Sequence, residues 1–265
     1  MATFQTSANT ALPNQLILIV DNVLKFKVIP ARGELVPFTL SITPSGSLTL
    51  VDQDVRTGAN FQIYTVKAAR VGTAQFSAQN AKGVKVGPVS VTIKAALKLP
   101  TSGGALALTQ LLLAESPSPY AVGYNATTAK TGMHWMRRVV QNRLDMKSSN
   151  VGSAGATSII DVMKAEGQFK GFENYPTIAQ AQRDTIEDIL AIANDGTHPK
   201  QKLFYDHINA AIAVPTESLI ADPAATKDPG TTKLLVGWRT AGASSPGSGF
   251  KLFRTFAGQD FYTLL

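Results

Sequence analysis

Apolar and polar residues alternate along the first third of the chain. The alternation is clearest in the segments LKFKV, FTLSITP, FQIYTVKA and VSVTIKA between residues 14 and 95, which are separated by turn-forming residues. A period of two places successive side chains on opposite faces of a strand, so each segment has one apolar face. About seven such segments in roughly 80 residues predict a β-sandwich in which each sheet buries one face.

The pattern changes after the sequence KLPTSGG at residues 98–104. From there, apolar residues recur at spacings of three and four, which is typical of amphipathic helices. This spacing predicts helices over residues 105–116, 131–146, 157–169 and 178–196, the last of them closed by Gly196 as its C-cap. Residues 221–249 are rich in loop-forming residues, and a loop of that length in a compact domain is often functional.

The two patterns together predict an α+β multidomain chain. Residues 1–98 are expected to form the β-sandwich, residues 99–104 a linker, and residues 105–265 a mainly α-helical domain. In the first domain, the sequence AARVGTAQFSAQNAKG followed by VGPVSVTIKA resembles bacterial immunoglobulin-like modules. This part of the chain has no His and its few carboxylates are scattered, so we expect a spacer or docking domain rather than a catalytic one.

Composition narrows the chemistry that the chain can perform. With 265 residues and 44% hydrophobic content, the chain is long and apolar enough to bury a core, and no apolar stretch is long enough to predict a membrane span. There is no Cys, which excludes disulfides and thiolate nucleophiles. His134, His198 and His207 lack the spacing of zinc ligands, and the last two are expected at the surface of a turn-helix region. We therefore expect no metal and no cofactor.

The positive charge of the chain is concentrated in its first part. Residues 1–100 contain ten Lys and Arg against four acids, a net charge of +6, whereas residues 101–265 contain 15 against 14, a net charge of +1. A basic domain attracts polyanions such as nucleic acid, an anionic membrane or an acidic cell-wall polymer. No nucleic-acid-binding motif accompanies the charge, so nucleic acid is not an expected partner.

One carboxylate stands out in the second part of the chain. Glu115 ends the apolar run of TQLLLAESPSPYAVGYNA and precedes a Ser-Pro-Ser-Pro break. At the C-terminal end of a helix, the helix dipole and partial burial both raise the pKa of a carboxyl group. A carboxylic acid that stays protonated near pH 7 can donate the proton that glycosidic bond cleavage requires. The alternative is an ordinary solvated Glu in a last helical turn.

Five blocks in the second part resemble, in this order, the cell-wall hydrolase family that includes spore-cortex lytic enzymes. The blocks are LLLAESPSPYAVG, MHWMRRVVQNRLD, IIDVMKAEGQFKGFEN, DGTHPKQKLFYDHIN and FAGQDFYTLL. The resemblance covers residues 105–265 and implies a lysozyme-like, mostly helical fold. It also implies lytic cleavage of peptidoglycan between N-acetylmuramic acid and N-acetylglucosamine.

The resemblance also implies roles for particular residues. It assigns the single catalytic Glu to Glu115. Residues that it places at the glycan are Ser116, Asn142 with its neighbour Arg143, Gln168 and Phe169. Apart from the resemblance, Tyr175, Tyr205 and Tyr262 are candidates for stacking on sugar rings, and the hydroxyl groups of Tyr175 and Tyr205 favour a place in a wet groove. The chain departs from the family where a Gly-His-x-Phe-Tyr block is usual, because Gln259 stands in the place of that histidine.

The number of carboxylates separates two mechanisms. A glycoside hydrolase needs a second carboxylate roughly 5 to 9.5 Å from the first, whereas a lytic transglycosylase uses one Glu as acid and then as base. Candidates for a second carboxylate are Glu166, Glu173 and Asp145, and none stands at a motif-defined spacing from Glu115. The sequence therefore favours a lytic transglycosylase.

The start of the chain bears on where the enzyme would act. The first 15 residues contain no Lys or Arg and no long apolar run, so no secretory signal is predicted. An enzyme made in the cytoplasm and acting on peptidoglycan in the periplasm or cell wall fits an antibacterial effector. Such an effector would be carried into a target cell by an injection apparatus and paired with a periplasmic immunity protein. A phage endolysin or tail-associated muramidase is the alternative, and a structural or adhesive wall-binding protein is an alternative of another class.

Overall fold

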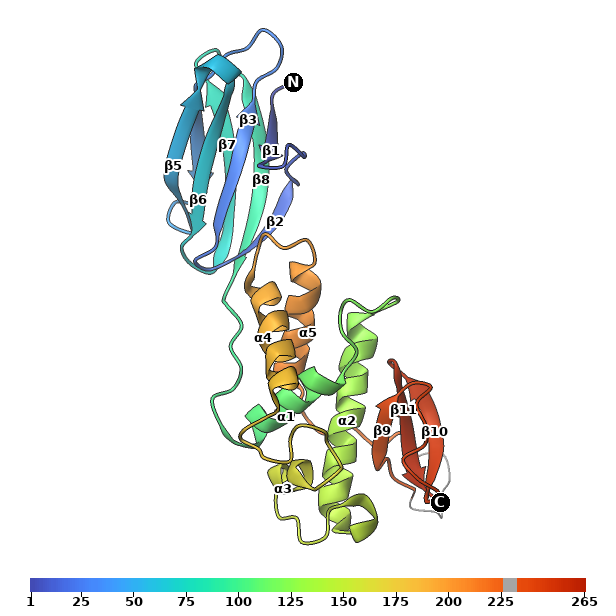
Figure 1. The fold of residues 1–265 in the computed structure, drawn as a ribbon. Helices are drawn as coiled ribbons and strands as arrows, with labels where there is room; N and C mark the ends of the chain where they lie inside the picture. Colours follow the sequence, from blue (N-terminus) through green and yellow to red (C-terminus); the bar gives the residue numbers. More distant parts are fainter. Residues whose placement is uncertain (226–232) are drawn as a thin grey trace. The chain divides into compact units, whose positions relative to one another are not determined.

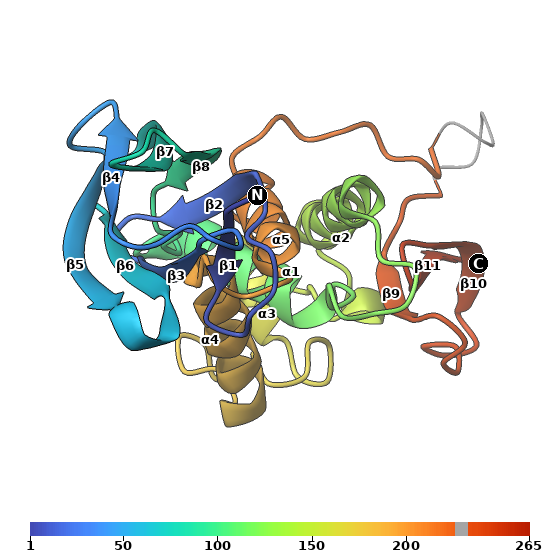
Figure 2. The ribbon, with the colours of Figure 1, turned by 90° about the horizontal axis from the view of Figure 1, so that it is seen from above.

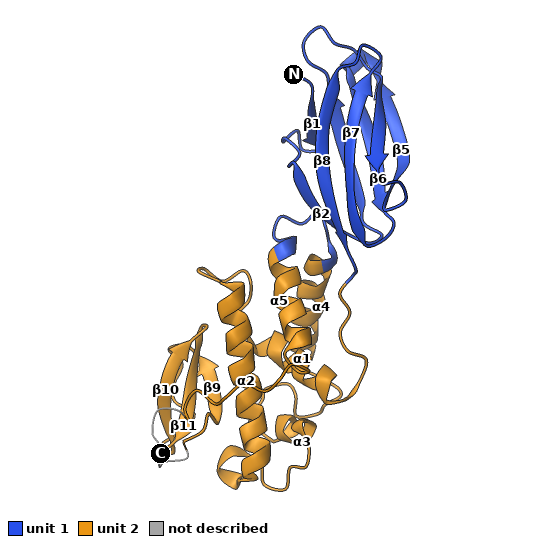
Figure 3. Cartoon of the chain, turned by 180° about the vertical axis from the view of Figure 1, so that it is seen from behind, with its two compact units in different colours: residues 1–96, 194–202 blue, residues 97–193, 203–265 orange. Residues whose placement is uncertain are grey.

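The computed structural model describes residues 1–225 and 233–265. The chain has a mixed α+β fold and divides into two compact units (Figure 3). Unit 1 comprises residues 1–96 and 194–202, and unit 2 comprises residues 97–193 and 203–265. The first boundary therefore lies slightly before the predicted linker, whose last residues already belong to a helix. The inclusion of residues 194–202 in unit 1 is not visible in the sequence pattern.

Unit 1 is built from two antiparallel-rich sheets of four strands each (Figure 1). One sheet has the order β1-β3-β6-β5 and the other β2-β8-β7-β4. The strands are β1 Thr3–Thr6, β2 Gln15–Ile19, β3 Val23–Ile29, β4 Phe38–Thr43, β5 Leu48–Arg56, β6 Phe61–Ala68, β7 Gly72–Asn80 and β8 Lys85–Lys94, with a 3-10 turn at Thr57–Ala59. All pairs are antiparallel except β2 with β8, which is parallel.

The core of unit 1 lies between the two sheets and is aromatic at its centre. Phe26 of β3 stacks on Phe76 of β7 with 4.7 Å between ring centroids, and Phe4 of β1 meets Phe26 edge-on at 5.3 Å. Side chains of β6 alternate between buried and partly exposed along the whole strand, as a period of two requires. Each sheet therefore has one apolar face, and the two apolar faces pack against each other. Strand β1 lies before residue 14, where the alternation begins, and the sequence pattern does not predict it.

Gly196 does not cap the fourth helix as predicted. Helix α4 ends at Asn194, and Gly196 does not adopt a positive φ angle. Its backbone instead passes close to β2 of unit 1, where an added Cβ would lie 2.5 Å from Asn22 Oδ1 and 3.0 Å from Leu18 Cα. The backbone N–H of Gly196 donates to Asn22 Oδ1 at 2.6 Å. Glycine is required here for close approach rather than for a left-handed turn.

Unit 2 contains the last three strands and the helices, apart from the last residue of α4 and the first two residues of α5. The helices are α1 Gly103–Glu115, α2 Ala126–Met146, α3 Ile159–Lys164, α4 Gln180–Asn194 and α5 Gln201–Ala213, with a 3-10 turn at Ser149–Val151. Their apolar faces form one core in which Leu111, Met136 and Phe204 are fully buried. Helix α2 begins where the Asn125 side chain accepts a hydrogen bond from the Thr128 N–H, so it starts five residues earlier than predicted.

The predicted helix over residues 157–169 is only partly correct. Helix α3 stops at Lys164, and Ala165 leaves the helical conformation. Gly167 has a φ angle of +70°, which glycine adopts without steric strain because it has no Cβ, and the chain turns there before Phe169. Of the loop predicted over residues 221–249, residues 226–232 lie outside the described residues. In the part of the chain that is described, no helix is long and apolar enough to cross a membrane.

Unit 2 ends in a three-stranded antiparallel sheet, although its sequence pattern predicts a mainly helical domain. Its order is β10-β11-β9, formed by β9 Gly237–Thr240, β10 Phe250–Phe256 and β11 Gln259–Leu264. Figures 1 and 2 agree that this sheet lies along one side of α2. Trp135 of α2 contacts it through Phe256, at 4.5 Å between ring centroids, and Phe261, at 5.1 Å.

Candidate functional site

Glu115 is the last residue of α1 and is half-buried. The three residues Leu111, Leu112 and Leu113 that precede it are buried, which anchors the helix end in the core. Ser116 then turns the chain into an extended conformation while its N–H closes the helix on the Leu112 carbonyl. Burial raises the pKa of the Glu115 carboxyl group, because removal of water disfavours its charged form.

Two residues of the three-stranded sheet hold Glu115. Trp238 of β9 donates its indole N–H to Glu115 Oε2 at 3.3 Å, and this bond acts against the effect of burial on the pKa. Gln259 of β11 donates its side-chain N–H to the Glu115 backbone carbonyl at 2.8 Å. The carboxyl group and the backbone of Glu115 are therefore held separately by two different strands.

Trp238 is the first member of a row of contacting side chains that also includes the aromatic Phe169 and the cationic Arg143. The Trp238 ring lies 5.2 Å from the ring of Phe169, and the Arg143 guanidinium lies 5.1 Å from the Phe169 centroid. Arg143 donates from Nη1 to Gln168 Oε1 at 2.8 Å and from Nε to the Val236 carbonyl at 2.6 Å. Burial lowers the pKa of Arg143 to about 10, so it remains cationic at neutral pH. The structure thus brings four of the predicted residues, Glu115, Arg143, Gln168 and Phe169, into one chain of contacts through Trp238.

Asn142 lies in the interior rather than on a surface that a glycan could reach. It is 3% exposed. Its side-chain amide donates to Asp222 Oδ2 at 2.6 Å and to the Leu235 carbonyl at 2.8 Å. Asn142 therefore connects α2 to the segment that leads into β9, and the predicted contact with substrate has no support in this geometry.

The three candidate tyrosines are not grouped around Glu115. Tyr175 is 7% exposed and belongs to the core of unit 2, and Tyr262 is 4% exposed within β11. Tyr205 is partly buried against the same core. The expected place of Tyr175 in a wet groove therefore does not fit the burial of its ring, and the ring of Tyr262 is buried as well.

The candidate second carboxylates have other surroundings. Glu173 Oε2 accepts a hydrogen bond from the Gly171 N–H at 2.8 Å and so stabilises a local turn. Asp145 is exposed and accepts from Gln141 one helical turn earlier, at 2.9 Å. Glu166 is exposed. Among the described residues, no group of three or more His, Cys, Asp or Glu is arranged to hold a metal ion.

His207 of α5 is buried, which corrects the expectation that it lies at the surface. It is 2% exposed, and its Nε2 lies 3.4 Å from Ser116 Oγ. Its Nδ1 lies 2.8 Å from the Tyr124 hydroxyl. Burial lowers the pKa of His207 to about 4, so the imidazole is neutral at physiological pH. Helical periodicity places His207 on the same face as fully buried Phe204, three residues earlier, and this is the sequence signal that indicates its burial.

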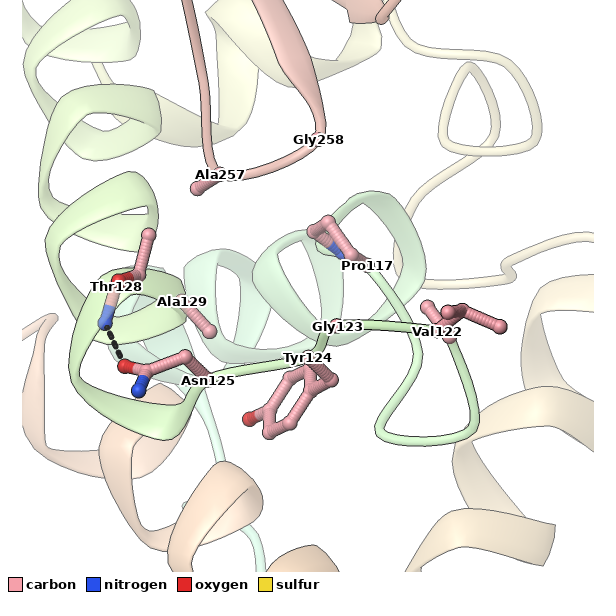
Figure 4. Close-up of a pocket in the computed structure, with 10 residues that line it drawn as sticks. Pro117, Val122, Gly123, Tyr124, Asn125, Thr128, Ala129, Ala257 and Gly258 are labelled. Carbon is pink, nitrogen blue, oxygen red and sulfur yellow. Dashed lines mark hydrogen bonds between the residues drawn. The ribbon is translucent and has the colours of Figure 1, made fainter.

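A pocket of about 320 Å³ adjoins the residues that follow Glu115 (Figure 4). One wall is the loop between α1 and α2, with Pro117, Val122 and Tyr124, and the opposite side is the turn at Ala257 and Gly258 between β10 and β11. The remaining lining residues are Ala121, Gly123, Asn125, Thr128 and Ala129. None of the lining side chains is charged, so the pocket suits an uncharged group.

The turn between β10 and β11 packs closely against both α2 and the loop that follows Glu115. A Cβ added at Gly258 would lie 2.9 Å from Pro117 Cγ, and one added at Gly132 of α2 would lie 2.8 Å from Ala257 Cβ. Gly258 also has a φ angle of +74°. Glycine at these positions lets the turn approach both α2 and the loop after Glu115, which places Gln259 where it reaches the Glu115 carbonyl.

Sequence reasoning missed Trp238, Gln259 and Tyr124. Trp238 stands in the stretch assigned as a loop, and only its being one of two Trp in the chain sets it apart. Gln259 stands out in the sequence only as a departure from the family pattern, and in the structure its side chain contacts the Glu115 carbonyl. Both residues are more than 120 positions from Glu115 in the chain, so no local pattern joins them.

No protein family matches the chain, and no curated protein matches it. Domains 4 and 5 of the S-layer protein SbsC are similar at 16% identity over 31% of this chain and 47% of that chain, with a TM-score of 0.23. Tandem immunoglobulin domains of titin are similar at 16% identity over 35% of this chain and 50% of that chain, with a TM-score of 0.23. A polysaccharide lyase aligns at 8% identity over 79% of this chain and 34% of that chain, with a TM-score of 0.28. The first two alignments span about half of the similar chains, and none of the three scores supports an argument about function.

The hydrogen bond from Trp238 predicts a measurable change in Glu115. In Trp238→Phe the ring contact with Phe169 is kept but the N–H donor is lost, so the pKa of the Glu115 carboxyl group is expected to rise further. Carbon-13 NMR titration of labelled glutamate carboxyl groups measures this directly. Trp135→Phe is the matched control, because Trp135 contacts Phe256 and Phe261 instead. An unchanged or lower pKa in Trp238→Phe would contradict the assigned hydrogen bond.

Proposed function

We propose that this protein cleaves peptidoglycan glycan strands between N-acetylmuramic acid and N-acetylglucosamine, with Glu115 as its catalytic acid and base. The observation that supports the proposal best is the Glu115 carboxyl group itself. It is partly buried at a helix end, its pKa is raised, and an indole N–H orients it. A carboxyl group prepared in this way is suited to donate a proton to a glycosidic oxygen.

The reaction that suits a single carboxyl group is lytic transglycosylation. Protonated Glu115 donates its proton to the glycosidic oxygen, and the bond from C1 of N-acetylmuramic acid to that oxygen breaks. The Glu115 carboxylate then accepts the proton of the 6-hydroxyl group of the same N-acetylmuramic acid, while the oxygen of this hydroxyl group forms a bond to C1. The products are a 1,6-anhydro sugar and a new free hydroxyl on the neighbouring sugar, and Glu115 is protonated again. No water is consumed, and no second carboxylate is required.

The aromatic and cationic residues beside Glu115 fit a site for sugars. The Trp238 ring is partly exposed and borders the carboxyl group, so it offers a face for stacking. Phe169 and Arg143 are buried behind it and hold the ring in place through the contacts described above. We therefore assign Trp238 to substrate contact and Phe169, Arg143 and Gln168 to support of that surface.

The proposal gives each unit a part. Unit 2 would be a lysozyme-like catalytic domain of the cell-wall hydrolase type, with an added three-stranded sheet that carries Trp238 and Gln259. Unit 1 would be an immunoglobulin-like module whose net positive charge favours anionic polymers of the wall. Peptidoglycan glycan strands are the proposed partner of the whole chain.

Product analysis tests the proposal. Purified sacculi are incubated with the protein, and the released muropeptides are analysed by mass spectrometry. We expect fragments that end in 1,6-anhydro-N-acetylmuramic acid and are 18 Da lighter than their hydrolysed counterparts, since no water is added.

Two other results would redirect the assignment. Reducing ends alone would mean hydrolysis, as in an endolysin or tail-associated muramidase, and would require a second carboxylate such as Glu166 or Glu173 to act in the complex. Binding to sacculi without any release would contradict the enzymatic proposal and favour a structural or adhesive wall-binding protein. Glu115→Gln serves as the inactive control in each case.

A further inference from the structure

The loop that follows Glu115 is fastened to α5 at both of its ends. Ser116, the first residue of the loop, contacts Nε2 of His207 at 3.4 Å. Tyr124, near its end, contacts Nδ1 of the same ring at 2.8 Å. One imidazole therefore joins two points that are eight residues apart in the chain. A closed loop of this kind has little freedom to move away from α5.

A third contact strengthens the attachment in the middle of the loop. The ring of Tyr120 meets Phe204 edge-on, with 4.8 Å between the centroids. Phe204 and His207 are three positions apart on α5 and therefore lie on the same face of that helix. Phe204 is fully buried, so the face that holds the loop is itself anchored in the core of unit 2.

The fastened loop controls the surroundings of Glu115. It begins one residue after Glu115, and Pro117 packs against Gly258, whose neighbour Gln259 binds the Glu115 carbonyl. Tyr124 at the other end of the loop lines the uncharged pocket in Figure 4. Movement of the loop would therefore shift one wall of the pocket and open a side of Glu115 to water.

A neutral imidazole is chemically suited to both contacts. In one tautomer Nδ1 accepts a hydrogen bond from the Tyr124 hydroxyl while Nε2–H donates a hydrogen bond to Ser116 Oγ. Burial lowers the pKa of His207 and raises that of Tyr124 to about 12, with the charge of neighbouring Asp206 adding to the second effect. Both groups are thus neutral over the pH range in which the enzyme would act, and the two hydrogen bonds persist across it.

We infer that His207 is a positioning residue, which fixes the loop after Glu115 and through it the environment of the catalytic carboxyl group and the wall of the adjoining pocket. The inference rests on the proposed function for its catalytic consequence. The attachment itself is a property of the fold. His207 touches neither Glu115 nor the pocket directly, so it acts through Ser116 and Tyr124.

Substitution of His207 tests the inference. His207→Phe keeps an aromatic ring but removes both hydrogen-bonding nitrogens, so the loop is released at its two ends. We expect kcat for peptidoglycan cleavage to fall by about 10- to 100-fold, the range that misplacement of a reacting group by about 1 Å produces. The alkaline limb of the pH profile is expected to move to lower pH, because water that reaches Glu115 lowers its pKa toward the ordinary value.

Milder variants keep the test decisive if His207→Phe folds poorly. Tyr124→Phe and Ser116→Ala each remove one of the two hydrogen bonds and leave the ring in place. Each is expected to show the same two changes in smaller measure, and the double variant should approach His207→Phe. His134→Phe is the matched control, because His134 of α2 pairs with Glu217 at 3.0 Å rather than with a residue of this loop.

A second measurement separates this inference from the proposed function. Carbon-13 NMR titration reports the pKa of the Glu115 carboxyl group whether or not the protein cleaves any substrate. Absence of lytic activity in the wild type would refute the proposed function. A lower pKa of Glu115 in His207→Phe would support the positioning role even then. If kcat, the pH profile and the pKa of Glu115 are all unchanged in folded His207→Phe, then His207 only stabilises the fold and the inference is wrong.

Discussion

Glu115→Gln is expected to reduce the rate of peptidoglycan cleavage by about 10²- to 10⁴-fold, the contribution typical of a general acid and base. Gln matches the shape of Glu and can still accept the hydrogen bond from Trp238, but it cannot donate a proton to a glycosidic oxygen or remove one from a hydroxyl. Turbidity of a suspension of purified sacculi measures the rate. Because one residue serves both steps in the proposed mechanism, the loss should fall at the upper end of this range.

The same substitution is not expected to destabilise the protein. The folded-state pKa of Glu115 is raised above its unfolded value, so the folded state binds more protons than the unfolded state between these two values. The free energy of unfolding of the wild type therefore falls as the pH rises through the folded pKa. Gln does not titrate and avoids this loss, so the variant should be at least as stable as the wild type near pH 8, as measured by urea denaturation.

Glu166→Gln is the matched control for this experiment. Glu166 belongs to the same unit and is exposed, so its replacement should leave both the rate and the stability nearly unchanged. Lysis at a near wild-type rate by Glu115→Gln would remove Glu115 from the mechanism. A large loss in Glu166→Gln would instead identify a second carboxylate and favour hydrolysis.

Asn142→Ala is expected to lower the free energy of unfolding of unit 2 by about 3 kcal/mol, through two buried hydrogen bonds that lose their donor. One of them goes to Asp222, a carboxylate that is 7% exposed and would keep the hydrogen bonds from the Leu235 and Ala224 N–H groups. A loss of this size lowers the thermal midpoint of a domain of about 160 residues by about 6 to 12 °C. Differential scanning calorimetry measures the midpoint.

The Asn142 experiment also decides between two roles for this residue. Gln141→Ala removes a neighbouring amide on the same helix, whose partner Asp145 is exposed, and should change stability by about 0.5 kcal/mol or less. If Asn142→Ala keeps the wild-type midpoint but weakens binding to glycan fragments, the residue contacts substrate as the family resemblance implies. A lower midpoint with unchanged binding by the folded protein supports the internal role.

The local sequence pattern was sufficient to predict those strands and helices that bury one face and expose the other. Strands such as β6 alternate between buried and partly exposed side chains residue by residue, so the period of two identified the sandwich before any contact was known. Helix α1 was predicted within two residues at its start and one at its end, because the apolar run and the Ser-Pro break after Glu115 are both local. The position of Glu115 at a helix end follows from the same signals.

Elements whose structure depends on distant partners were not predictable in this way. The sheet of β9, β10 and β11 buries residues against α2, more than a hundred positions earlier in the chain, and its short strands are interrupted by loop formers. The expected helix at 157–169 failed at Ala165, where the chain turns so that Phe169 can reach Trp238. In each case long-range packing overrode the local periodicity.

The sequence by itself determined the division into a β-rich and a helix-rich part, the charge of the first part, and the placement of one carboxylate at the end of an apolar helix. Only the tertiary structure decided what surrounds that carboxylate: the indole of Trp238, the amide of Gln259, and the loop held by His207. It also placed Asn142 in the interior, whereas the family resemblance implied a glycan-binding residue. The physical reason is that periodicity reports which face of an element is buried, whereas hydrogen-bond partners and burial of polar side chains depend on which faces meet when the chain folds.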